Sequence, residues 1–153
     1  MSVPDCMVAV NVPGDGNCMF HALAYSLKGS ARRTAAELRA DAVQYMRAHL
    51  DQPLFPANDA TTAREWIGFA GYPSAEQYLQ TLARNGTWGQ SLELAALCHV
   101  LSRPLGVYSP DAKSKCRLIA TFLPTSPEAR AQQPIFVLYV GSNHYMALTL
   151  KTA

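Results

Sequence analysis

The chain has 153 residues, 49% hydrophobic and 16% charged, which suits one compact domain over residues 1–153 with its own apolar core. Lysine and arginine total 13 against 11 acidic residues, and their scattered distribution argues against a nucleic-acid partner. No apolar run approaches the roughly 18 residues of a membrane helix, and no basic segment opens the chain, so we expect no membrane partner and no Sec-dependent export.

The first two thirds of the chain predict one strand followed by helices. A short β-branched strand at 7–12 precedes the turn-forming sequence PGDGN. Residues 51–73 predict a surface excursion with one helical turn at 64–69. Asp15 or Asn17 is the predicted cap of the first helix, and Ser74 with Gln77 has the spacing of a capping box for the third. Apolar residues at helical spacing predict the helices at 18–27, 34–50, 74–83 and 91–101.

The last third of the chain changes to the period of strands. Short apolar or alternating runs, separated by Pro, Gly, Ser and Asn, predict strands at 104–109, 117–123, 134–140 and 144–150. Helices gathered early and strands gathered late predict an α+β fold with a mostly antiparallel central sheet flanked by helices. The strand at 7–12 is a candidate to join that sheet.

Cys18 stands where a turn-rich loop meets the first helix, in the segment GDGNCMFHALAYSL. The helix dipole and the unpaired N–H groups of a helix start favour a thiolate, and with the preceding glycine-rich loop they are suited to binding an oxyanion. The sequence therefore predicts a nucleophilic thiol, whereas a buried structural cysteine is the commoner alternative. We expect Cys6, Cys98 and Cys116 to be core or surface residues. The cysteines form no CxxC spacing, so neither a disulfide framework nor a metal site is expected.

A nucleophilic thiol needs a base, and His144 is the best placed of the four histidines. It follows a GSN turn and begins a strand, a rigid mount that folding can bring to Cys18. His21 lies three residues after Cys18 on the same helix, with no evident group to orient its ring. His49 and His99 lie near helix C-termini, where histidines commonly bond carbonyl groups. A turn histidine without a catalytic role is the alternative for His144.

Three segments occur in order along the chain: GDGNCMFHAL, then TWGQSLELAALCHVLSRPLGVY, then NHYMAL. They resemble the nucleophile motif, the Trp-Gly and Glu-Leu helix, and the histidine strand of the ovarian tumour (OTU) cysteine proteases, which act as deubiquitinases. Their order and spacing cover nearly the whole chain, from Val10 to Leu150. The resemblance implies a papain-like OTU fold.

The resemblance also implies a reaction. A thiol-dependent hydrolase of this family cleaves the (iso)peptide bond after the C-terminal glycine of ubiquitin, polyubiquitin or a ubiquitin-like modifier, through an acyl-thioester and without a cofactor. Cys18 would attack the carbonyl carbon and His144 would transfer the protons. Asp15, which the family convention counts as an active-site residue, would shape an oxyanion loop made of Asp15, Gly16, Asn17 and Cys18.

Four residues beside these are candidates for substrate binding. Trp88 and Gly89 match a family element near the active site, although Trp88 is equally compatible with a core position and we favour that interpretation. Tyr145, next to His144, is a candidate to flank the channel for the Gly-Gly tail of ubiquitin, and a buried strand tyrosine is the alternative. Asn143 precedes the histidine and completes the set.

The sequence departs from the family pattern at Met146. Many members carry Asn or Asp two residues after the histidine, and a thioether does not accept a strong hydrogen bond from the imidazole ring. Asn11, a polar residue in an otherwise apolar strand, is the first candidate for this orienting role, with Asn143 and Asp5 behind it. The alternative for Asn11 is a strand-end residue that starts the turn.

An active deubiquitinase is the expected function, and two others remain open. One is a catalytically weak or inactive ubiquitin-binding module in which Met146 marks lost chemistry. The other is a viral-type cysteine protease that processes a polyprotein with the same site. Retention of both Cys18 and His144 favours the enzyme over the inactive module. We expect a monomer in the cytoplasm, or in the host cytosol for a pathogen effector or viral domain.

Overall fold

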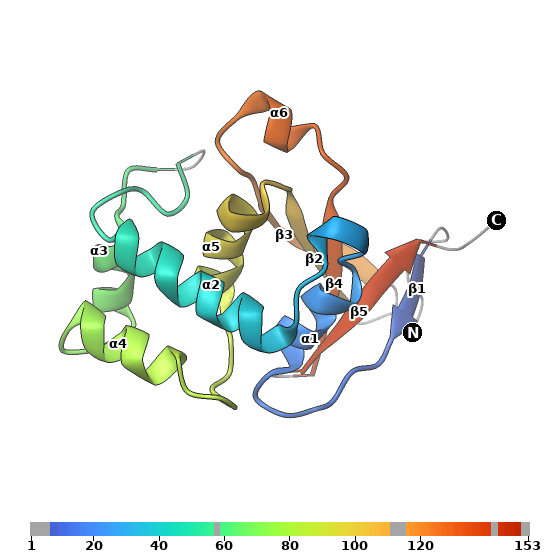
Figure 1. Cartoon of the computed structure of the whole chain (residues 1–153), viewed down its shortest axis with the longest axis horizontal. Coiled ribbons are helices and arrows are strands. Elements are labelled where there is room, and N and C mark those ends of the chain that lie inside the picture. The colour runs from blue at the N-terminus through green and yellow to red at the C-terminus, as the bar shows by residue number, and fades with distance from the viewer. Residues whose placement is uncertain (1–6, 57–58, 111–115, 142–143, 151–153) are drawn as a thin grey trace.

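The computed structural model describes residues 7–56, 59–110, 116–141 and 144–150, and it contains a five-stranded sheet (Figure 1). The strand order is β1-β5-β4-β2-β3, in which β4 and β2 are parallel and the other neighbours are antiparallel. The predictions of a mostly antiparallel sheet and of an N-terminal strand within it are confirmed. The strands are β1 Met7–Val10, β2 Leu105–Pro110, β3 Cys116–Phe122, β4 Ile135–Val140 and β5 His144–Leu150.

The predicted helices are present, and two short helical segments were not predicted. The Ser126 hydroxyl accepts a hydrogen bond from Ala129 N–H, and proline occupies the first helical turn, so the capping signal of the last short helix was readable in the sequence. The helices are α1 Cys18–Tyr25, the 3-10 turn η1 Gly29–Ala31, α2 Ala35–Ala48, α3 Ala63–Phe69, α4 Ala75–Leu82, α5 Ser91–Leu101 and α6 Pro127–Arg130. Each prediction is confirmed to within a few residues at its ends.

The helices cover one face of the sheet. α1 packs on β5 and β4, and α2 packs against both α1 and α5 (Figure 1). Alternation along β5 sends Ala147 into the large core beneath the helices, whereas Leu148 belongs to a small cluster on the other face with Leu138. This packing holds the start of α1 against the start of β5, and the predicted nucleophile and base lie at those two ends.

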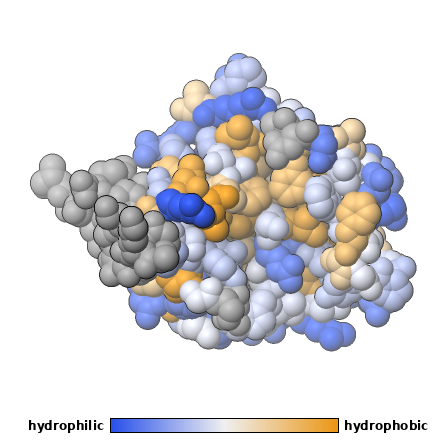
Figure 2. Space-filling model, turned by 180° about the vertical axis from the view of Figure 1, so that it is seen from behind, coloured by the Kyte–Doolittle hydropathy of each residue, from blue (hydrophilic) through white to orange (hydrophobic). Residues whose placement is uncertain are grey.

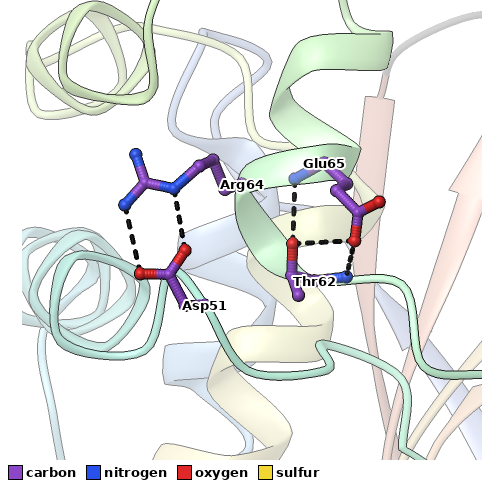
Figure 3. Close-up of polar contacts among 4 residues, drawn as sticks. All are labelled: Asp51, Thr62, Arg64 and Glu65. Atoms are coloured by element: carbon purple, nitrogen blue, oxygen red, sulfur yellow. Dashed lines mark hydrogen bonds and ion pairs between the residues drawn. The ribbon is translucent and has the colours of Figure 1, made fainter.

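Two polar contacts lie within the segment between α2 and α4 (Figure 3). Arg64 donates from Nε to Asp51 Oδ1 at 2.9 Å and from Nη2 to Asp51 Oδ2 at 3.3 Å. Thr62 and Glu65 form a reciprocal capping box at the start of α3. Both contacts lie at the surface, so they add little to overall stability.

None of the helices among the described residues has the length and apolar character needed to cross a lipid bilayer. Asp5, Cys6 and Asn143, which carried sequence predictions, lie outside the described residues.

Candidate active site

Cys18 is the first residue of α1 and only 1% of its surface is exposed. Asn17 occupies the N-cap position as predicted, but its side chain makes no capping hydrogen bond. Asp15 instead folds the loop locally, because its Oδ1 accepts the Asn17 N–H at 2.9 Å. Asp15 thus contacts the loop backbone, and its part in receiving an oxyanion stays a prediction.

The pKa of the Cys18 thiol is raised above its usual value, chiefly by burial. The backbone N–H groups of Tyr145 and Met19 donate toward the sulfur and oppose this rise, while the charge of Asp15 adds to it. The sequence predicted a thiol activated by the helix start, and burial outweighs that influence here. A pKa raised by burial favours the protonated thiol, so attack needs a base that removes its proton.

His144 opens β5 and is held by Asn11. The distance from His144 Nε2 to Asn11 Oδ1 is 2.9 Å, inside the range of a hydrogen bond. Because the amide oxygen only accepts, Nε2 is assigned as the protonated nitrogen and Nδ1 as the acceptor. A Cβ built on Gly14 would lie 3.8 Å from both Cε1 and Nδ1 of the ring, so the ring lies beside the loop that leads to Cys18.

The sheet register explains why Asn11 reaches the histidine. β1 pairs antiparallel with β5, and the last pair is Val10 with Ala147. Continuing this register by one residue sets Asn11 opposite Met146, on the face of the sheet that His144 shares. Asn11 and His144 are then diagonal cross-strand neighbours, a separation that two polar side chains can bridge. The neighbouring strand thus supplies the amide that position 146 lacks.

The predicted oxyanion loop is tightly folded. Cys18 N–H donates to the Asp15 carbonyl at 3.1 Å, and Asn17 N–H donates to the Asp15 carboxylate. Two of the predicted oxyanion donors are therefore engaged within the loop and must exchange partners to bind an oxyanion. Gly16 is buried against the turn that follows α4, since a Cβ there would lie 1.5 Å from the carbonyl oxygen of Gly86.

The three remaining substrate-binding candidates within the described residues surround this site. Trp88 is 39% exposed, so the favoured interpretation of a core tryptophan is wrong. Gly89 packs on α1, where an added Cβ would lie 2.4 Å from Met19 Cε. Tyr145 is half-buried, its ring centroid is 4.8 Å from that of Tyr139, and burial raises its pKa to about 12. Their roles toward a substrate stay predictions.

Cys98, His49 and His99 have structural surroundings. Cys98 is 1% exposed and donates to the Ala95 carbonyl, which confirms the core assignment. His49 Nδ1 lies 2.8 Å from the Tyr45 carbonyl oxygen, and His99 Nε2 lies 3.3 Å from a carbonyl of the excursion before α3. Both rings stack on Tyr45. Among the described residues, no group of three or more histidine, cysteine or acidic side chains is arranged to hold a metal ion.

Two buried charged residues near the site were missed by sequence reasoning. Arg39 is 5% exposed and Glu93 is 0% exposed. The signal for Arg39 was present, because it lies three and four residues before Ala42 and Val43 on the buried stripe of α2. Burial raises the pKa of Glu93 to about 7, although the hydroxyl of Tyr78 donates to its carboxylate.

Comparison with known proteins identifies the family. Residues 13–145 match the sequence profile of the OTU-like cysteine proteases. Deubiquitinase OTUD6B of Gallus gallus is 32% identical over 104 residues, an alignment that covers 67% of this chain and 33% of that protein. Ovarian tumor domain-containing deubiquitinating enzyme 4 of Arabidopsis thaliana is 27% identical over 144 residues, covering 92% of this chain and 43% of that one. The chain therefore spans less than half the length of either relative.

A solved structure agrees in fold. The Hazara virus OTU bound to ubiquitin superposes with a TM-score of 0.65 at 22% identity, covering 96% of this chain and 83% of that chain. Since the profile match extends over most of the sequence and the same fold is present, this chain belongs to the OTU-like cysteine protease family.

Proposed function

We propose that this chain is a deubiquitinase that hydrolyses the (iso)peptide bond after the C-terminal glycine of ubiquitin or a ubiquitin-like modifier. The observation that carries the proposal is the hydrogen bond between Asn11 and His144 beside the helix that begins at Cys18. A nucleophile, a base and a group that orients the base are the three parts that thiol-dependent acyl transfer needs.

The assigned tautomer sets the direction of proton transfer. Asn11 keeps the proton on His144 Nε2, so Nδ1 is free to take the proton of the Cys18 thiol as the sulfur attacks the carbonyl carbon. The tetrahedral intermediate collapses to a thioester when Nδ1 returns that proton to the leaving amine. Water, deprotonated by the same nitrogen, then attacks the thioester and releases the carboxylate and the thiol. Acylation and deacylation each return His144 to its starting protonation state, and the remaining proton of the attacking water is released to solvent as the product carboxyl group ionises.

A protein substrate is supported by two observations. The related proteins described above are named deubiquitinases, and the superposed viral domain is bound to ubiquitin. The chain also exposes large apolar side chains, and Figure 2 shows apolar surface gathered in the middle of one face with polar residues around it. Such a surface is typical of protein recognition sites. Among the described residues, the large apolar side chains that are exposed are Tyr25, Phe69, Trp88, Leu118, Ile119 and Leu123.

The inactive binding module and the polyprotein-processing protease are less favoured. Met146 was the reason to consider lost chemistry, and Asn11, the residue after β1, supplies the missing amide. The names of the relatives favour ubiquitin over a viral polyprotein as substrate. We further propose that the chain acts as a monomer in the cytoplasm, where ubiquitin conjugates are available to it.

The test is hydrolysis of ubiquitin carrying a C-terminal fluorogenic amide. We expect turnover by the wild-type chain, none by Cys18→Ala, and a loss of at least about a hundredfold in kcat for His144→Ala, as expected for removal of a general base. His49→Ala, which changes a histidine bonded to a backbone carbonyl, is the matched control and should retain near-normal turnover. Near-normal turnover by His144→Ala would assign the base elsewhere, with His21 the first residue to examine.

A further inference from the structure

Arg39 is a buried cation whose hydrogen bonds all reach neutral oxygens. It lies on α2 and is 5% exposed. Three of its four acceptors are backbone carbonyls, and the fourth is a side-chain amide oxygen. Nη1 donates to the Leu82 carbonyl at 2.7 Å, and Nη2 donates to Thr87 O at 2.7 Å, Asn17 Oδ1 at 2.6 Å and Gly16 O at 3.3 Å.

This arrangement is costly for a structural contact alone. No ion pair with Arg39 occurs within the part of the chain that the structure describes. Burial is the main cause that lowers its pKa, and the charges of Glu93 and Asp15 oppose that shift. An arginine guanidinium stays protonated in proteins, so a full positive charge is buried here. The guanidinium also lies 4.5 Å above the ring centroid of Phe20 on α1. The buried guanidinium donates hydrogen bonds to several backbone segments at once, which an apolar side chain at this position could not do.

The segments it holds include the loop before the nucleophile. Leu82 ends α4, Thr87 lies in the following turn, and Gly16 and Asn17 immediately precede Cys18. Asn17 extends the same network, because its Nδ2 donates to Asn85 Oδ1 at 2.9 Å and its Oδ1 accepts from Gly86 N–H at 3.0 Å. These bonds explain why Asn17 sits at the N-cap position without capping its own helix.

The contact with Gly16 fixes the direction of one peptide group. The carbonyl of a trans peptide and the N–H of the next residue point in opposite directions. Since the Gly16 carbonyl turns inward to Arg39, the Asn17 N–H must turn away from the guanidinium, and it meets the exposed carboxylate of Asp15. A rotated peptide would direct the carbonyl oxygen outward and repel an oxyanion.

We propose that Arg39 is a positioning residue for carbonyl attack: it holds the Gly16–Asn17 peptide with its carbonyl inward and its N–H on the side of Asp15, so that this N–H can serve the oxyanion once it leaves the Asp15 carboxylate. This inference rests on the proposed function for the reaction that it serves. Arg39 touches no reacting atom, and it acts through the backbone of residues 16 and 17.

The experiment compares two reactions of the same thiol. Hydrolysis of the fluorogenic ubiquitin amide passes through an oxyanion, whereas alkylation of Cys18 by iodoacetamide needs the sulfur but no oxyanion site. Arg39→Lys keeps the charge and loses the planar fork that serves several acceptors. We expect kcat to fall at least about tenfold with KM changed less than about threefold, because loss of oxyanion stabilisation lowers kcat. The alkylation rate at Cys18, followed by peptide mapping, should stay within about twofold.

The matched control is Arg47→Lys, two turns further along α2. Arg47 is a surface residue paired with Glu76, and its variant should keep the wild-type values of kcat, KM and alkylation rate. The amide signals of Gly16, Asn17 and Gly86 in a nitrogen-15 spectrum provide a third measurement. They should move in Arg39→Lys and stay in place in Arg47→Lys.

Each outcome decides the proposal. Wild-type kcat in Arg39→Lys overturns it, and so does a parallel fall of hydrolysis and alkylation, which would mean a general structural role. If the wild-type chain does not cleave ubiquitin, the proposed function fails, and the amide signals alone then support or overturn the positioning role. If Arg39→Lys does not fold, Asn17→Ala removes an acceptor of the same network and must show the same separation of the two reactions.

Discussion

Asn11 directly follows β1, and the continued register of β1 and β5 places it opposite Met146, so these two positions determine how the imidazole of His144 is held. The thioether of Met146 offers no strong acceptor, whereas Asn11 Oδ1 lies 2.9 Å from Nε2. An orienting amide therefore need not come from the strand that carries the histidine. The distance agrees with the one expected for an orienting residue, and the catalytic effect of Asn11 stays a prediction.

Asn11→Ala should slow ubiquitin hydrolysis while leaving the fold intact, because the ring loses its partner but the base itself remains. The loss in kcat should be smaller than that of His144→Ala. Adding Met146→Asn to Asn11→Ala should restore part of the activity, since the new amide occupies the position that many family members use. Steady-state kinetics with a thermal unfolding control measure both effects. Normal turnover by Asn11→Ala would leave Cys18 and His144 as an unassisted pair.

Gly14 and Gly16 give a second residue-level prediction, because they lie two residues apart in one loop but have different surroundings. A Cβ on Gly16 would lie 1.5 Å from the Gly86 carbonyl oxygen, so Gly16→Ala must push apart the loop and the turn after α4. We expect it to lose at least about 2 kcal/mol of unfolding free energy, a typical cost of overpacking, together with most of its activity.

Gly14→Ala is the matched control. Its Cβ would make ordinary contact with the His144 ring at 3.8 Å, so the variant should fold normally and keep activity within a few-fold. Urea denaturation and hydrolysis rates measure both variants. Equal behaviour of the two variants would contradict the close packing of Gly16.

At the scale of elements, the start of α5 carries a buried carboxylate. Glu93 lies in the first turn, where its Oε1 accepts the Gln90 N–H at 2.8 Å and its other oxygen accepts from Tyr78 on α4. These bonds and the charge of Arg39 favour the ionised form, and burial outweighs them, so the pKa of Glu93 rises from 4.5 to about 7. The junction of α4 and α5 is thus sensitive to pH.

The sign of this dependence follows from linkage. A carboxyl whose pKa is higher in the folded than in the unfolded chain binds more protons when folded, so its contribution to stability is full below pH 4.5 and is lost as the pH rises through about 7. The difference between the two pKa values corresponds to a change of about 3 kcal/mol at most in the free energy of unfolding. Glu93→Gln keeps an acceptor for Tyr78 and cannot ionise, so its unfolding free energy should fall less between pH 5 and pH 8 than that of the wild type. Urea denaturation at both values tests this, and equal slopes for the two proteins would contradict the raised pKa.

The sequence predicted helices correctly where apolar periodicity or a capping side chain alone determined them. Periodic apolar residues located α2, α4 and α5, and Thr34 and Ser74 cap their helices through their own side chains. The prediction that Asn17 caps α1 was only partly right, because Asn17 is at the N-cap position but its side chain bonds to Arg39 and to the turn after α4. Only tertiary packing brings these partners near. The prediction of a core position for Trp88 was wrong for a similar reason, because the local sequence around a tryptophan after a turn does not indicate how exposed its side chain is.

In the whole molecule, the pairing of strands in the sheet determines where the candidate active site forms. β1 and β5 are at opposite ends of the chain, and their pairing brings Asn11 to His144 across 133 positions of sequence. The packing of α1 on β5 then brings the start of the helix to the start of the strand. The sequence identified Cys18, His144 and Asn11 as candidates by residue type and position. It could not indicate that burial raises the pKa of Cys18, nor that Arg39 joins the loop to two other segments, because both depend on long-range packing.

The central claim is that Cys18 is the nucleophile that attacks the carbonyl after the C-terminal glycine of ubiquitin. The most direct measurement is to incubate the chain with ubiquitin carrying a C-terminal electrophile and to map the modified residue by mass spectrometry. We expect a single adduct at Cys18, because it begins α1 directly after the loop that lies beside His144, whereas Cys98 lies within α5 and burial raises its pKa to about 12. Cys18→Ala should give no adduct. Modification at Cys6, Cys98 or Cys116, or an adduct that persists in Cys18→Ala, would contradict it.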